Sequence, residues 1–136
     1  MKSFLIAILA LITLAVASCQ KDSGSTTPAT DSSPSVIQID FPATGAIYAN
    51  GSALNITGTI TDNNNLSTAK VEVKNKTTNA TLNQQTSSTG NVSFYRFQWS
   101  WTITGITATT PGTVKITAKD KNGFEVTKEV DITLDN

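Results

Sequence analysis

From residue 35 to the C-terminus, apolar and polar side chains alternate in short runs that turn-forming residues separate. A period of two is typical of β-strands that bury one face, and no stretch keeps the 3.6-residue period of an amphipathic helix. The predicted strands have apolar side chains at Ile37, Ile39 and Phe41; Leu54, Ile56 and Ile60; Ala69, Val71 and Val73; Tyr95, Phe97, Trp99 and Trp101; Val114, Ile116 and Ala118; and Phe124, Val126, Val130, Ile132 and Leu134.

Clusters of polar residues mark the expected connections. Asp62-Asn63-Asn64-Asn65 is expected to turn the chain between two strands, and Asn122-Gly123 to form a tight hairpin turn. The alternation slips at Thr127, which predicts a β-bulge near Lys128. The polar stretch 77–91 is expected to be a solvated connection, with a short edge strand as the alternative.

These runs amount to about seven antiparallel strands, which favours two sheets packed face to face within residues 35–136. Three patches of this region resemble bacterial immunoglobulin-like domains: residues 41–45 with 51–58, residues 61–62 with 66–73, and residues 114–120 with 122–123. The resemblance implies an all-β, immunoglobulin-like β-sandwich. The chain differs from antibody domains because it lacks their paired cysteines.

The N-terminal segment has the order of a secretory signal. Lys2 precedes an apolar stretch from Phe4 to Val16, and small residues lead to Cys19 in Val16-Ala17-Ser18-Cys19. This segment resembles a bacterial lipoprotein signal, which implies that residues 1–18 are cleaved and that Cys19 is diacylated at the new N-terminus. An uncleaved anchor and an ordinary signal peptide are the alternatives, although a membrane-spanning helix needs about 20 apolar residues.

The residues after Cys19 bear on location and reach. Gln20-Lys21-Asp22 resembles the export signal of Bacteroidetes-type surface lipoproteins, although Ser23 stands where a second acid is usual. The resemblance implies a lipid-anchored protein of a Gram-negative outer membrane, exposed at the cell surface. Residues 19–34 include no apolar side chain larger than alanine after Cys19, so we expect a flexible linker that spans on the order of 20 Å.

Composition narrows the chemistry. Cleavage after residue 18 would remove Lys2 alone from ten basic and ten acidic side chains, so the net charge stays near zero. Without a cluster of Lys and Arg, nucleic acid is a poor partner. The chain has no histidine, and lipid would occupy its one cysteine, so the usual catalytic bases and nucleophiles are missing. We therefore expect no enzyme activity and no cofactor.

A calcium site is the one metal site considered. Asp62 and Asn64 in one expected turn and Asp120 in another could supply oxygen ligands. The alternative is that these residues only form the turns, because their side chains hydrogen-bond their own backbone.

Aromatic residues are the other candidates for binding. The rings of Tyr95, Phe97, Trp99 and Trp101 share one side of a strand, where they are expected to form core, although Tyr95 or Trp101 could instead be exposed for stacking on sugars. Phe94 points to the opposite side, and Tyr48 lies near a turn, so both are further candidate ligand contacts.

The sequence leaves three functions open. The first is a module for adhesion or protein–protein interaction, the second a glycan-binding accessory module, and the third a structural spacer. Exposed tryptophan would favour glycan. A buried aromatic strand with an unpaired edge would favour protein binding by strand addition.

Overall fold

The computed structural model describes residues 33–136. Within this range the chain forms β1 (Val36–Phe41), β2 (Ala46–Ala49), β3 (Ala53–Asn75), β4 (Thr81–Thr102), β5 (Thr110–Asp120) and β6 (Glu125–Asp135). Among residues 33–136, no helix is long and apolar enough to cross a membrane. The predicted signal peptide and most of the linker, with Cys19, Lys21 and Asp22, lie outside the described residues.

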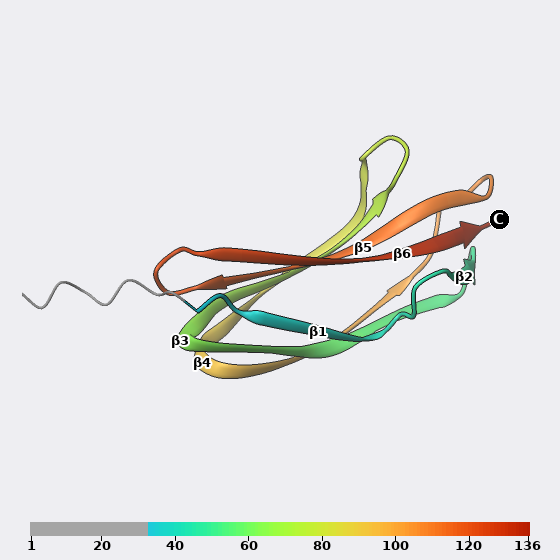
Figure 1. The fold of residues 1–136 in the computed structure, drawn as a ribbon. Helices are drawn as coiled ribbons and strands as arrows, with labels where there is room; N and C mark the ends of the chain where they lie inside the picture. The colour runs from blue at the N-terminus through green and yellow to red at the C-terminus, as the bar shows by residue number, and fades with distance from the viewer. Residues whose placement is uncertain (1–32) are drawn as a thin grey trace, which may run out of the picture.

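Two layers of strands face each other across the core (Figure 1). In one layer, residues 53–61 of β3 lie between β1 and the second half of β4. In the other, residues 66–75 of β3 lie between β5 and the first half of β4, and the sheet continues through β6 to β2. β3 and β4 thus pass together from one layer to the other. The expected all-β, immunoglobulin-like sandwich is confirmed, although β2 pairs with β6 in parallel rather than antiparallel.

The inner faces of the strands supply the core, as the alternation predicts. Leu54, Ile56 and Ile60 of β3 are fully buried in the same cluster as Val114 and Ile116 of β5. Each such side chain stabilises the fold by about 1.5–3 kcal/mol when it leaves water.

Gly58 interrupts the aliphatic row of β3 for a steric reason. A Cβ atom there would lie 2.1 Å from the carbonyl oxygen of Gln38 and 2.5 Å from Cζ of Phe97. The Phe97 ring, only 3% exposed, therefore occupies the space that a side chain at residue 58 would need. Gly58 lets β1 and β4 close on β3 from its two sides.

The turn expected at Asp62–Asn65 is confirmed, because the chain reverses direction there (Figure 1). The pairing of β3 with β4 continues around the turn, with a shift in register between Thr61 and Leu66, so the 23 residues of β3 form one strand. Asn65 has a φ of 66°, a value that asparagine tolerates better than most residues. The four polar residues therefore reverse the chain at the point where β3 passes from one layer to the other.

Residues 77–91 form the turn and edge strand given as the alternative, so the expected solvated connection is wrong. Only a short turn follows β3, closed by the Asn75 side chain, which accepts hydrogen bonds from the backbone N–H groups of Thr77 and Thr78. From Thr81 the chain forms the first half of β4, which pairs with β3 in the hairpin that projects from the two layers (Figure 1).

The β-bulge expected near Lys128 does not occur. The β5–β6 register is unbroken from Thr110 to Lys119, and Lys128 lies opposite Ile116. Lys128 holds a position of the inward set, and its Nζ donates a hydrogen bond to the carbonyl of Ile37 in β1 at 3.0 Å. A lysine in the apolar row, rather than an extra residue, explains the slip in the pattern.

Candidate functional site

The two carboxylates proposed for calcium bond the protein itself. Asp62 accepts hydrogen bonds from the Ser35 hydroxyl at 2.5 Å and from the Asn64 backbone N–H at 2.7 Å. Oδ1 of Asp120 accepts from the N–H groups of Asn122 and Phe124, both at 2.8 Å, while its buried Oδ2 has no partner. Within residues 33–136, no group of three or more His, Cys, Asp or Glu residues could hold a metal ion. Both carboxylates thus act in turns, and the expectation that they bind no calcium stays a prediction.

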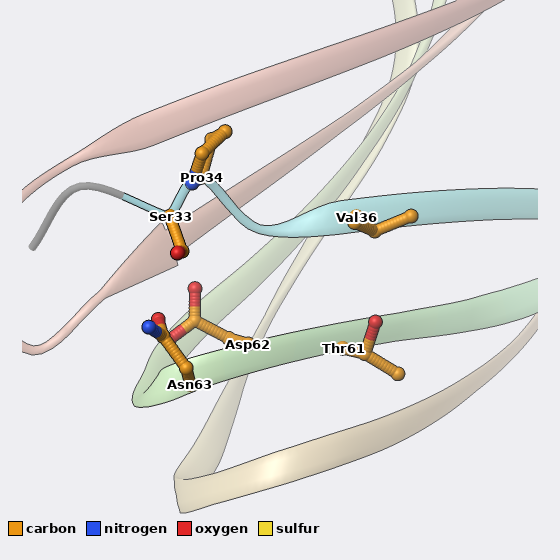
Figure 2. Close-up of a pocket in the computed structure, with 6 residues that line it drawn as sticks. All are labelled: Ser33, Pro34, Val36, Thr61, Asp62 and Asn63. Carbon is orange, nitrogen blue, oxygen red and sulfur yellow. The ribbon is translucent and has the colours of Figure 1, made fainter.

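A hollow of about 330 Å³ lies at the end of the domain where the chain enters β1. Figure 2 shows the residues that line it. The side chains of Ser33 and Asp62 point toward one another in it, whereas Pro34 points away. The hydrogen bond from Ser35 to Asp62 links the residue before β1 to the turn of β3.

The aromatic strand is the second half of β4, Phe94–Thr102, called here the aromatic half. Phe97 is buried, and Tyr95, Trp99 and Trp101 are half-buried against the core. Their rings therefore lie on the inner face, the arrangement expected for core residues. Phe94, by contrast, is 57% exposed on the outer face. The fourth candidate contact, Tyr48 in β2, is half-buried against the core.

β4 pairs with β3 on one side only, so among the described residues its other edge is open. The direction of its backbone groups follows from one contact: Ile103 donates its N–H to the Ser52 carbonyl at 2.9 Å. Hydrogen-bonded pairs alternate along an antiparallel ladder. The backbone groups that hydrogen-bond to β3 are therefore those of Tyr95, Phe97, Trp99 and Trp101. The N–H and C=O groups that point to the open edge are those of Phe94, Arg96, Gln98, Ser100 and Thr102.

The other edges have features that discourage pairing with another chain. β1 has six residues, a register shift after Ile39, and Pro42 directly after it. β2 has only four residues. The part of β6 that β2 leaves uncovered contains Glu125, Lys128 and Glu129. Short strands, bulges, proline and charge are the devices that protect sheet edges.

β4 lacks most of these devices. Its 22 residues include no proline, no lysine and no acid, and Arg96 is its only charged side chain. The register shifts between Leu66 and Thr68 of β3 bend β4 at residues 89–93, so each half presents a separate edge. The aromatic half combines an open backbone edge with half-buried rings on one face and polar side chains on the other. We regard this edge as the candidate site, and sequence reasoning missed it because it did not show which strand lies at the edge.

Side chains on the outer face beside this edge form cross-strand rows. Val36, Thr61 and Phe94 make one row, Gln38, Thr59 and Arg96 the next, and Phe41, Thr57 and Gln98 a third. A shallow groove of about 210 Å³ lies among Asp40, Phe41, Thr57, Arg96, Phe97 and Gln98.

The ion pair between Lys76 and Asp131 contributes to stability and is not part of the candidate site. Lys76, after the end of β3, bonds Asp131 of β6, and Thr113 of β5 donates a second hydrogen bond to the same carboxylate. The hydrogen bond from Lys76, and then that from Thr113, lower the pKa of Asp131 below its ordinary value.

No protein-family model matches this chain, and no curated protein matches it. Among solved structures, the chain is similar to fibronectin(III)-like modules of CbhA from Clostridium thermocellum. That likeness has 18% sequence identity and a TM-score of 0.48, and it covers 74% of this chain and 96% of that chain. The described residues themselves form an immunoglobulin-like sandwich in which β4 has an open and unprotected edge.

Proposed function

We propose that this protein is a non-catalytic surface lipoprotein that binds a partner protein by strand addition at the aromatic half of β4. The observation on which the proposal rests is the open edge of that half, where the N–H and C=O groups of alternate residues face away from β3. An extended segment can satisfy these groups with main-chain hydrogen bonds, and its side chains then supply specificity.

The half-buried rings support a protein partner over a glycan. Trp99 and Trp101 point into the sandwich, so neither offers an open face on the outer surface for a sugar ring. They retain partial exposure because the neighbouring position in the sheet is empty, and an added strand would cover them. Removing this apolar area from water would stabilise the complex by about 25 cal/mol for each Å² buried.

The anchor in this proposal rests on the sequence. Cys19 would take the lipid, Lys21 and Asp22 would direct export to the outer face of the outer membrane, and the linker would hold the domain clear of the lipid. Display at a surface also lowers the entropic cost of meeting a partner in the same membrane, because both are confined to one plane.

A photo-crosslinking experiment in the producing cells tests the proposal. A benzoylphenylalanine at Gln98 should cross-link one discrete protein, whereas the same group at Thr127, on the uncovered part of β6, should not. Ser100→Pro should abolish the cross-link, because the Ser100 N–H points to the open edge and its loss leaves the β3 ladder intact. Thr127→Pro is the matched control.

The proposal is wrong if Gln98 gives no adduct, or if the adduct survives Ser100→Pro with the protein still folded. The first outcome would favour a structural spacer, and the second a binding site elsewhere on the domain.

A further inference from the structure

We infer that Arg96 selects an acidic residue in the segment that adds to β4, and that Phe94 selects an apolar residue two positions away. This inference rests on the proposed function, since it names the chemistry of the partner for the same edge.

The ladder determines which side chains can meet. In an antiparallel pair, side chains directly opposite each other have Cβ atoms about 4.5–5.5 Å apart. An added strand would therefore place three successive outer-face residues, at alternate positions, against Phe94, Arg96 and Gln98. These three side chains are all exposed on the outer face.

Arg96 has no ionic partner of its own in the described part of the chain. The ion pairs there are Lys70 with Glu72, Lys76 with Asp131 and Lys119 with Glu125. Asp40 lines the same groove, but it lies on β1, two strands from β4, and accepts a hydrogen bond from Gln38 at 3.0 Å. A guanidinium at an open edge, the only charge on its strand, complements a carboxylate on the incoming strand.

The residues near Arg96 indicate which other side chains the added segment would carry. Phe94 is 57% exposed, and Val36 in the same cross-strand row is 64% exposed, so this end of the outer face is apolar. On the inner face, an added strand would contact the exposed parts of Tyr95, Trp99 and Trp101, which favours apolar residues there. Because an antiparallel partner runs in the opposite direction, its outer-face residues read polar, acidic and apolar at every second position from its N-terminus.

Peptide titration of the full mature chain in detergent tests this selection. The probes are two seven-residue peptides with valine at every inner-face position and with glutamine, glutamate and leucine on the outer face, or lysine in place of the glutamate. Tryptophan emission is the readout, because an added strand should shift it to the blue and reduce iodide quenching. We expect the glutamate peptide to bind about five- to tenfold more tightly than the lysine peptide.

Charge reversal at Arg96 should invert this preference. Arg96→Glu should bind the lysine peptide more tightly, whereas Lys121→Glu, an equal change of charge in the exposed turn after β5, should leave the preference unchanged. Ser100→Pro should abolish binding of both peptides.

The other outcomes separate the two proposals. Equal binding of both peptides, lost in Ser100→Pro, would overturn selection by Arg96 and leave strand addition standing. No binding of either peptide would overturn both. Polygalacturonate, an acidic polysaccharide, is the third probe: if it alone changes the emission, and only when Arg96 is present, the site takes a glycan and both proposals are wrong.

Discussion

Gly58→Ala tests the packing that holds the aromatic half of β4 in place. The new Cβ would lie 2.1 Å from the carbonyl oxygen of Gln38 and 2.5 Å from Cζ of Phe97, whereas comfortable contacts between heavy atoms are about 3.5 Å or longer. The carbonyl can move only with the backbone of β1, and the ring is buried. Overpacking costs about 1–3 kcal/mol, and two neighbours that cannot yield easily place this variant near the upper value, at about 3 kcal/mol.

Thermal unfolding of the mature chain, followed by tryptophan emission, measures the effect. A domain of about 100 residues loses about 4–8 °C of melting temperature per kcal/mol, so we expect a decrease of about 12–24 °C. Thr59→Ala, at the adjacent outward position, is the control and should cost about 1 kcal/mol or less. Adding Phe97→Leu to Gly58→Ala should cost less than the two single changes together. A melting temperature for Gly58→Ala within about 3 °C of the parent would refute the steric argument.

Four further predictions concern the anchor, the layers and the charges. Cys19→Ala should move the protein from the membrane to the soluble fraction and abolish labelling by radioactive palmitate. Lys128→Met should lower stability by about 1 kcal/mol in urea unfolding, because the Ile37 carbonyl loses its donor; an unchanged midpoint would count against that contact. The lowered pKa of Asp131 means that its contribution is complete above the ordinary carboxyl pKa and is lost as the pH falls through the lowered value; Asp131→Asn should therefore flatten the acid limb of stability against pH, and an unaltered limb would contradict this. Calcium and chelator should leave the melting temperature unchanged, since Asp62 and Asp120 already accept hydrogen bonds; a rise with calcium would indicate a site.

The residues on the inner face of the sandwich could be predicted, because apolar and polar residues alternate along a strand that buries one face. Leu54, Ile56 and Ile60 alternate and are buried, and the four rings of β4 lie on the predicted side. The alternation did not predict the first half of β4, which extends beyond the core. The residues of β4 opposite Val71 and Val73 are Gln85 and Asn83, and polar side chains on both faces leave no pattern to detect.

The Asp62 segment shows a different limit. Aspartate and asparagine favour turns because their side chains bond nearby backbone N–H groups, and Asp62 does bond the N–H of Asn64. The chain does reverse at this segment, as these residues predict (Figure 1). Local chemistry therefore located the turn, but it did not show that β4 turns beside β3 and that the two strands stay paired around the turn.

The candidate site depends on topology, which explains why no residue pattern revealed it. Whether a strand is open is decided by its neighbours, and the same β4 sequence between two strands would offer no backbone groups. One signal was available: a strand of 22 residues with Arg96 as its only charge. Because open, uncharged edges promote unwanted pairing, and because β1, β2 and β6 are each protected, an unprotected β4 is best explained by a partner that covers it.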